Sequence, residues 1–226
     1  MVRKRELDCF IQARITSKRF PKKVLKKIKE NTILEIIFKR LSLSKNIRKI
    51  VFLIPKNKKN LPLLKYLIKK KYKYICGSEK NVLSRYYTAA KKYKSKYILR
   101  VTSDCPFVDS QLIDQLFKKF IKKNINYASN TNPPSFPDGF DIEIFDFQSL
   151  KKTFENTNNK SDLEHVTPFL IRNKSFKRFN LKHMKDYSKH KLSIDTQEDY
   201  IRVKKIFNFF NNILIDYKNV LKKLNY

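Results

Sequence analysis

The stretch Cys9-Phe-Ile-Gln-Ala-Arg-Ile-Thr-Ser-Lys-Arg-Phe-Pro-Lys-Lys-Val-Leu25 decides how the rest of the chain is interpreted. It begins inside an apolar, β-prone segment, Leu7–Ile11, and continues into a polar and basic loop that ends at Pro21. An α/β protein places an anionic ligand where a buried strand runs into such a loop, at the carboxyl edge of its sheet. Backbone N–H groups and fixed cations can bind phosphates there. The stretch is therefore either a phosphate-binding loop or an ordinary solvated basic loop.

Helical and strand patterns alternate along the chain, which predicts an α/β fold with a largely parallel sheet. Periodicity and turn residues predict strands over 7–12, 49–54, 72–76, 97–102, 125–129, 140–145, 176–181 and 192–194. Helices are expected over 32–43, 61–70, 81–93, 111–122, 161–171, 197–210 and 212–224, the fifth of them with a capping-box pattern from Ser161 to Glu164. No linker or internal repeat interrupts the pattern, so a single domain over residues 1–226 is predicted.

The composition is that of a globular but extremely basic protein. Hydrophobic residues make up 41% of the chain, and the formal net charge of +32 by itself suggests a polyanionic partner such as nucleic acid. The lysines, however, are spread over the whole chain, and only two residues are glycine. This profile indicates a compositional bias toward Lys, Asn, Ile and Tyr. We therefore expect no specific nucleic acid partner, although weak, salt-dependent binding of polyanions follows from the charge.

The three cysteines, Cys9, Cys76 and Cys105, have no paired spacing, which predicts free thiols. No apolar signal segment opens the chain, and no apolar run approaches the length of a membrane span. We therefore expect a cytoplasmic protein without a membrane span.

Two acidic residues follow predicted strands at widely separated positions. Asp104 lies in Arg100-Val-Thr-Ser-Asp-Cys-Pro-Phe-Val-Asp109, just after the strand 97–102. Asp195 lies in Leu192-Ser-Ile-Asp-Thr-Gln-Glu-Asp199, at the end of the short strand 192–194. Carboxylates from two strand ends can bind Mg²⁺ against nucleotide phosphates. The alternative is that each acid caps a turn or a helix.

An acidic segment, Ser135-Phe-Pro-Asp-Gly-Phe-Asp-Ile-Glu-Ile-Phe145, contains one of the two glycines. In so glycine-poor a chain, Gly139 predicts a positive φ at that position. The segment is either an ordinary polar turn or a loop whose carboxylates accept hydrogen bonds from the hydroxyls of a sugar.

Together these segments resemble the cytidylyltransferases that activate acidic sugars, above all the spore-coat-polysaccharide branch. The basic loop is similar to the family pattern I-I-Q-A-R-x-G-S-T-R-L-P-G-K-V-L. The later segments resemble R-I-T-G-D-C-P-L-I-D, F-P-D-G-L-D-V-E-V-F and L-T-V-D-T-P-E-D. Residues 77–87 and 163–168 resemble G-x-x-x-D-V-L-D-R-F-Y and E-H-V-T-P. The matches follow the family's order over residues 7–205 and leave the C-terminal helix unassigned.

The resemblance implies a nucleotide-diphospho-sugar-transferase-like fold, with a mixed sheet flanked by helices. It also implies a Mg²⁺-dependent transfer of CMP from CTP to an acidic or modified sugar, with pyrophosphate as the second product. CTP and a sugar acceptor are thus the expected partners, and a homodimer is compatible with them. The resemblance places Gln12, Ala13, Arg14, Ser17, Arg19, Lys23, Arg85 and Asp104 in the nucleotide site. It places Asp138, Gly139, Asp141, Glu143, Glu164 and His165 in the acceptor site. It assigns catalysis to Arg14, Lys23, Asp104 and Asp195, and the metal to Asp104 and Asp195.

The chain departs from the family pattern at three glycine positions, which are Thr16, Lys22 and Ser103 here. Glycine permits a positive φ and a close approach of the backbone to a phosphate, so these losses bear on the shape of the loop and on activity. Three alternatives therefore stay open: a glycosyltransferase of related fold, a degenerate homologue that binds nucleotide without turnover, and a basic nucleic-acid-binding protein.

Overall fold

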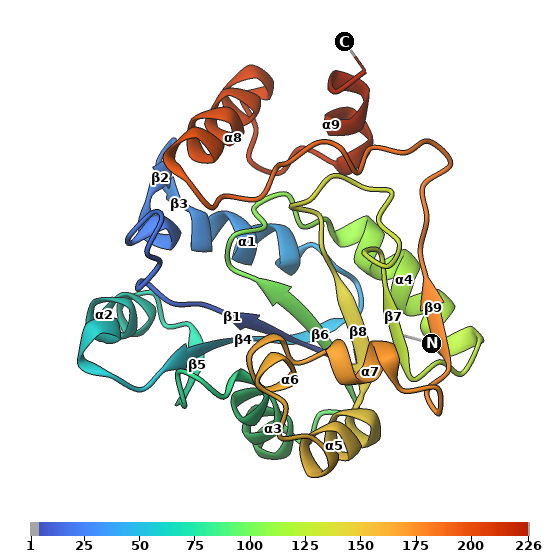
Figure 1. The fold of residues 1–226 in the computed structure, drawn as a ribbon. Coiled ribbons are helices and arrows are strands. Elements are labelled where there is room, and N and C mark those ends of the chain that lie inside the picture. Colours follow the sequence, from blue (N-terminus) through green and yellow to red (C-terminus); the bar gives the residue numbers. More distant parts are fainter. Residues whose placement is uncertain (1–4, 226) are drawn as a thin grey trace.

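A seven-stranded sheet with helices on both faces forms the centre of the structure (Figure 1). The computed structural model describes residues 5–225. The strands are β1 (Leu7–Gln12), β2 (Lys27–Ile28), β3 (Asn31–Thr32), β4 (Ile47–Pro55), β5 (Lys73–Gly77), β6 (Tyr97–Thr102), β7 (Tyr127–Ser129), β8 (Glu143–Asp146) and β9 (Arg178–Asn180). The helices are α1 (Ile33–Ser42), α2 (Leu61–Lys69), α3 (Val82–Tyr93), α4 (Ser110–Lys122), α5 (Phe147–Asn156), α6 (Lys160–His165), α7 (Pro168–Arg172), α8 (Gln197–Phe210) and α9 (Tyr217–Lys223), with 3-10 turns η1 (Lys23–Leu25) and η2 (Lys58–Asn60).

The strand order is β5-β4-β1-β6-β8-β7-β9, and β2 and β3 form a separate small hairpin. Strands β5, β4, β1 and β6 are parallel, whereas β8 runs antiparallel to both β6 and β7. The last strand, β9, is parallel to β7. The α/β class and the mixed sheet predicted from the sequence are therefore confirmed.

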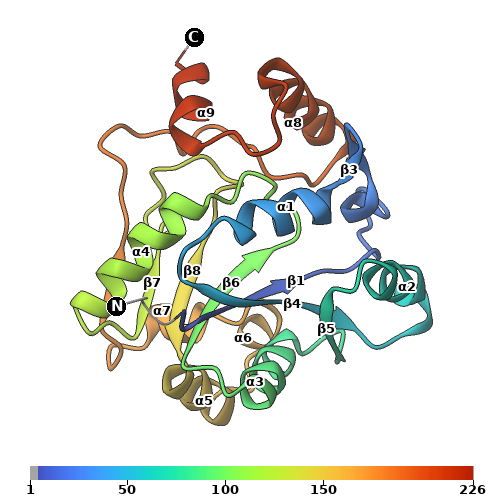
Figure 2. The same cartoon turned by 180° about the vertical axis from the view of Figure 1, so that it is seen from behind.

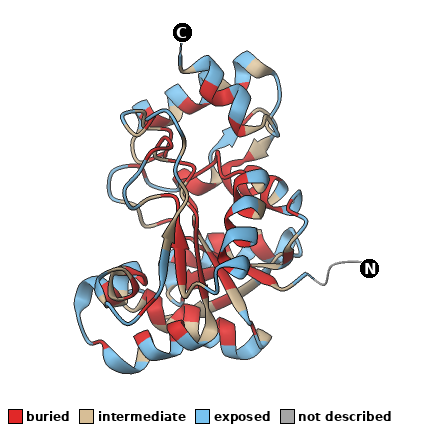
Figure 3. Cartoon of the chain, turned by 90° about the vertical axis from the view of Figure 1, so that its right-hand side faces the viewer, coloured by how far each residue is buried: buried red, intermediate tan, exposed pale blue. Residues whose placement is uncertain are grey.

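Strand β1 lies in the middle of this sheet and divides the core into two layers. Leu7, Cys9 and Ile11 pack on the side of α1 and α4, whereas Phe10 packs on the side of α3, because successive strand residues point to opposite faces. Helices α8 and α9 extend the first layer, and α5 joins α3 in the second (Figures 1 and 2). The buried residues accordingly concentrate along the strands and the inner helix faces (Figure 3).

The parallel strands β4, β1 and β6 end at the same edge of the sheet. The connection that follows β1 leads through α1 to β4, on one side of β1, while β6 lies on its other side. Such a reversal of strand order opens a crevice at the carboxyl edge, where α/β proteins bind ligands. The basic loop after β1 therefore enters this crevice.

The prediction of one continuous helix over 161–171, capped at Ser161, is wrong. It is split into α6 and α7 at Val166, whose φ is 72°. Pro168 begins α7, because proline lacks the N–H that a continuous helix would need. The side chain of Asn159 caps α6 by accepting a hydrogen bond from the N–H of Ser161, so the predicted capping box does not form.

The segment 192–194 was predicted to be a strand, but it does not join the sheet. It crosses the carboxyl edge of the sheet instead. The N–H of Leu192 donates to the carbonyl of Asp138, and the N–H of Ile194 donates to the carbonyl of Asp104. Both partners belong to loops, so the segment ties two loops together without extending the sheet. Asp195 therefore reaches the edge from a crossing segment and not from a strand end.

The start of the last helix and the presence of helix α5 also differ from the prediction. The last helix begins only at Tyr217, after its N-cap Asp216, because Asn211 adopts the left-handed conformation that ends α8. Helix α5, capped by Asp146, was not predicted, since its sequence continues directly from β8 without a turn residue.

In residues 5–225 no helix combines the length and the apolarity that crossing a membrane would demand. Cys9, Cys76 and Cys105 are all free thiols.

Gly139 has a φ of +116°, so the positive φ predicted from the sequence is confirmed. A Cβ at this position would lie 2.5 Å from the carbonyl carbon of Leu192. Gly139 thus permits the close crossing of the segment 192–194 over the acidic loop.

We expect Gly139→Ala to lower the free energy of unfolding by about 2 kcal/mol or more, because it adds both backbone strain and a backbone clash. Urea unfolding followed by circular dichroism measures this loss. The matched control is Gly77→Ala, where φ is not positive and the new Cβ would meet a side chain, at 2.7 Å from the Cγ of Arg85, and no backbone. An equal or smaller loss for Gly139→Ala than for Gly77→Ala would contradict this account of the crossing.

Candidate active site

A cleft of about 1160 Å³ opens at the carboxyl edge of the sheet. The loops after β1, β4 and β6, the acidic loop, the end of α6 and the crossing segment all contribute to its lining. With Glu79, Val82 and Arg85 from the loop after β5 and the start of α3, the structure thus brings together seven parts of the chain. Of the site residues expected from the sequence, the following line the cleft: Gln12, Ala13, Arg14, Ser17, Arg19, Lys23, Arg85, Asp104, Asp138, Asp141, Glu164, His165 and Asp195.

The ammonium group of Lys23 joins the two predicted metal ligands. Its Nζ donates to Asp104 Oδ2 and to Asp195 Oδ1, both at 3.1 Å, and to the carbonyl oxygen of Ile194 at 2.6 Å. The two carboxylate oxygens are therefore no more than about 6 Å apart, because each contacts the same nitrogen. The lysine side chain is only 10% exposed. Three segments of the chain thus meet at one buried cation.

The carboxylate of Asp195 is surrounded by cations. Besides Lys23, it contacts Arg19 at 3.1 Å and Lys191 at 3.4 Å. Partial burial alone would raise the pKa of this carboxyl, but the hydrogen bond and charge of Lys23 outweigh it and lower the pKa. Asp195 is positioned by the start of α8, because its N–H donates to the carboxylate of Asp199 in the first turn of that helix.

Asp104 and Asp195 are suited to a divalent cation by their chemistry. Both offer hard carboxylate oxygens, which Mg²⁺ prefers, and both already bind a cationic group in the form of the Lys23 ammonium. The structure thus brings the two acids, which lie far apart in the sequence, to the same place.

The loop after β1 keeps its turn without the family's glycines. Lys22 adopts a left-handed conformation with a φ of 57°, and its N–H donates to the carbonyl of Ile15 at 3.1 Å. Thr16 and Ser103 do not adopt a positive φ. Of the three positions where the family has glycine and this chain does not, only Lys22 therefore requires a left-handed backbone.

The basic wall of the cleft comes from two loops. Arg14 and Lys18 belong to the loop after β1, and Lys58 and Lys59 to the loop after β4. The buried amide of Asn60 ties the two loops together by accepting a hydrogen bond from the N–H of Ile15. Lys58 and Lys59 were not predicted as site residues. Their position directly after a buried strand that ends at Pro55 was the signal that could have identified them.

Arg85 is buried at the inner end of the cleft, where it packs against Gly77. Its guanidinium donates to the carbonyl of Leu53 at 2.8 Å, and within residues 5–225 its Nε has no hydrogen-bond partner. Burial lowers the pKa of Arg85, and the positive charge of Arg14 contributes in the same direction. An anionic or polar ligand group in the cleft would therefore find a desolvated donor here.

The opposite wall of the cleft is acidic. Burial raises the pKa of Asp138, although the hydroxyl of Ser193 donates to its carboxylate at 2.6 Å. Burial and the charge of Asp138 together raise the pKa of Asp141 to about 7. Glu164 and His165 are exposed at the rim of this wall.

Two of the expected acceptor-site residues lie outside the cleft lining. Gly139 is buried beneath the crossing segment. Glu143 pairs with Arg100 and accepts a hydrogen bond from the hydroxyl of Tyr127, so its carboxylate is already engaged in the sheet.

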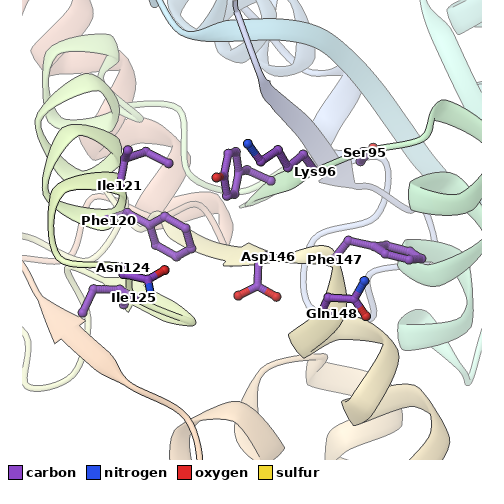
Figure 4. Close-up of a pocket in the computed structure, with 10 residues that line it drawn as sticks. Ser95, Lys96, Phe120, Ile121, Asn124, Ile125, Asp146, Phe147 and Gln148 are labelled. Atoms are coloured by element: carbon purple, nitrogen blue, oxygen red, sulfur yellow. The ribbon is translucent and has the colours of Figure 1, made fainter.

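A second, smaller cavity of about 360 Å³ lies at the other edge of the sheet, beside the start of β6 and the end of β8 (Figure 4). Phe120, Ile121 and Phe147 contribute much of its lining. Its carboxylate, Asp146, already caps α5 and accepts a hydrogen bond from Asn126. This cavity lacks the paired acids and the basic wall of the larger cleft, which is therefore the candidate active site.

A family model described as cytidylyltransferase matches residues 9–225. The chain belongs to the cytidylyltransferase family. It is 34% identical over 219 residues to the uncharacterized protein MJ1063 of Methanocaldococcus jannaschii, covering 95% of this chain and 88% of that protein. It is 28% identical over 210 residues to the spore coat polysaccharide biosynthesis protein SpsF of Bacillus subtilis, covering 87% and 84%. The structure of a cytidylyltransferase from Leptospira borgpetersenii superposes with a TM-score of 0.92 at 30% identity, covering 97% of this chain and 94% of that one.

These similarities confirm the family resemblance and the fold class expected from the sequence. The chain is accordingly a nucleotidyltransferase of the cytidylyltransferase type. The family match also includes α9 and most of the tail after residue 205, which the sequence motifs had left unassigned.

The raised pKa of Asp141 predicts how the free energy of unfolding depends on pH. An unfolded aspartate loses its proton near pH 4, so between about pH 4 and pH 7 the native state binds more protons at this site than the unfolded state. The free energy of unfolding therefore falls with rising pH over this range, and Asp141→Asn removes the fall. We expect the variant to gain about 2–3 kcal/mol relative to wild type between pH 5 and pH 8, measured by urea unfolding.

Asp199→Asn is the matched control, because the pKa of Asp199 is held at about 2 despite partial burial, chiefly by its hydrogen bond from Lys191. Its cost should be constant between about pH 5 and pH 8, since the carboxyl is ionised in both states there. A pH-independent difference for Asp141→Asn would show that its pKa is not raised.

Proposed function

We propose that this cytidylyltransferase transfers CMP from CTP to a hydroxyl group of an acidic or modified sugar, with pyrophosphate as the second product. The observation that carries the proposal is the cleft itself, in which a basic wall, a pair of carboxylates on one cation and an acidic wall face one another. The sugar class rests on the resemblance to the spore-coat branch of the family. We place the reaction in the cytoplasm, where three free thiols would be stable.

The basic wall would bind the triphosphate. Arg14, Lys18, Lys58 and Lys59 all line the cleft from exposed positions and could reach the β- and γ-phosphates. Arg19 and Lys23 approach the same region from beside Asp195. Arg85, buried and with a free Nε donor in the described structure, would contact the nucleotide at the inner end. Positioning and charge neutralisation would thus account for most of the catalysis.

Asp104 and Asp195 would bind Mg²⁺, which, when bound, neutralises charge on the triphosphate and on the pyrophosphate that leaves. The acidic wall would orient the acceptor, because Asp138 and Glu164 can accept hydrogen bonds from sugar hydroxyls. With a pKa of about 7, Asp141 is suited to take the proton from the attacking hydroxyl near neutral pH.

We expect Asp104→Ala and Asp195→Ala each to reduce pyrophosphate release by at least about 100-fold, because they remove carboxylates that act on the same metal–triphosphate unit. The double variant should be little worse than either single variant, since residues that act as a unit are non-additive. Each single variant should melt only a few degrees below wild type, because a cleft-edge carboxylate contributes little packing and the Lys23 ammonium keeps two of its three acceptors. Melting curves and a pyrophosphate assay on the same samples measure both effects.

The matched control is Asp114→Ala, which removes a carboxylate of α4 outside the cleft. Asp114 accepts hydrogen bonds from Ser44, Lys45 and Asn46, so its loss should cost stability and leave turnover per folded molecule unchanged. Stability loss with retained activity in the Asp104 and Asp195 variants would instead identify these residues as simple caps.

The proposal also predicts the choice of nucleotide. With Mg²⁺ present, CTP should raise the melting temperature more than UTP, ATP or GTP does at the same concentration, because a ligand that binds more tightly stabilises the native state more. Equal stabilisation by UTP or GTP would contradict the assignment of CTP. Stabilisation by CTP without pyrophosphate release, across sugar acids and modified sugars, would identify a degenerate homologue.

A further inference from the structure

The three N–H donors of Lys23 are all used in the structure. They point to Asp104, Asp195 and the carbonyl of Ile194, the three acceptors described above. An ammonium group has no further donor to offer to a phosphate. In this arrangement Lys23 cannot contact the triphosphate without leaving the carboxylates.

Lys23 takes the position that a metal ion would need. A divalent ion that bridges Asp104 and Asp195 must approach their oxygens to roughly 2.1 Å, and the Nζ of Lys23 already lies 3.1 Å from each of them. A second cation bound to these same two oxygens would lie in direct contact with the ammonium, and at such short separation two cations repel each other strongly. Arg19 and Lys191, by contrast, contact Asp195 but not Asp104.

The crowding of the carboxylates gives a physical reason for them to bind the lysine. Asp104 and Asp195 lie close together at a partly buried edge, and Asp138 adds a third negative charge nearby. Carboxylates gathered in this way destabilise one another unless a cation compensates them. The left-handed turn at Lys22 begins η1 and carries the next residue, Lys23, to this point.

We propose that Lys23 and the divalent metal bind Asp104 and Asp195 in alternation. In the ligand-free protein the ammonium closes the metal site and compensates its charge. Binding of the metal displaces the ammonium, whose three donors then become available to the β- and γ-phosphates of the nucleotide. This exchange rests on the proposed function for its second half, but the competition between lysine and metal does not depend on any nucleotide.

Mn²⁺ binding in the absence of nucleotide tests the competition, with free Mn²⁺ measured by electron paramagnetic resonance. We expect Lys23→Met to bind Mn²⁺ at least about tenfold more tightly than wild type, because a competing charge in direct contact is removed. Lys191→Met is the matched control. It removes a partly exposed cation that contacts Asp195 and Asp199 but not Asp104, and it should change the Mn²⁺ affinity by no more than about twofold.

The melting temperature gives a second readout on the same proteins. Without metal, Lys23→Met should melt roughly 5 °C below wild type, because its carboxylates have lost their shared cation. Saturating Mn²⁺ should restore most of that difference. Equal or weaker Mn²⁺ binding by Lys23→Met, or no binding by either protein, would overturn the proposal.

A measurement on the wild-type protein avoids any dependence on the folding of the variant. Reductive methylation followed by peptide mass spectrometry reports how accessible each lysine amine is. Lys23 should react slowly without metal and several-fold faster with saturating Mn²⁺, while exposed Lys18 in the same loop should react equally in both. Unchanged protection of Lys23 in the metal-bound protein would show that lysine and metal bind together. Pyrophosphate release from CTP, tested separately, would still decide the proposed function.

Discussion

The buried ammonium of Lys23 is the contact on which the candidate site depends. It lies where the loop after β1, the loop after β6 and the segment before α8 come together. A charge with so little exposure is tolerated only when it is paired and fully hydrogen-bonded. Asp104, Asp195 and the carbonyl of Ile194 meet that requirement, so the position of the lysine and the positions of the two acids determine one another.

The backbone makes this meeting possible through an equally tight contact. The segment 192–194 passes so close to Gly139 that any side chain there would collide with the backbone of Leu192. Hydrogen bonds from Leu192 to the Asp138 carbonyl and from Ile194 to the Asp104 carbonyl then fix the crossing. In a chain with only two glycines, one is used where the acidic loop and the crossing segment touch.

The cleft has walls of opposite charge, and this division follows from the order of the strands. The loops after β1 and β4 supply the cations, whereas the loop after β6 and the segments on its far side supply Asp104, Asp138 and Asp141. Polyphosphate and sugar hydroxyls are complementary to these two walls. The lining of the cleft is much closer to neutral than the protein as a whole, because its cations are accompanied by a group of carboxylates.

The sequence by itself determined the α/β class and the family, and most of the site residues that it predicted line the cleft, because local periodicity and short motifs encode strands, helices and loop chemistry. Only the tertiary structure decided the rest. The motif around Asp195 looked like a strand end, but its hydrogen bonds go to two distant loops. Glu143 belongs to the same acidic motif as Asp141, yet its carboxylate pairs with Arg100 on the neighbouring strand. Lys58 and Lys59 join the basic wall only because β4 lies beside β1. Pairings of this kind join residues far apart in the sequence, and no local pattern records them.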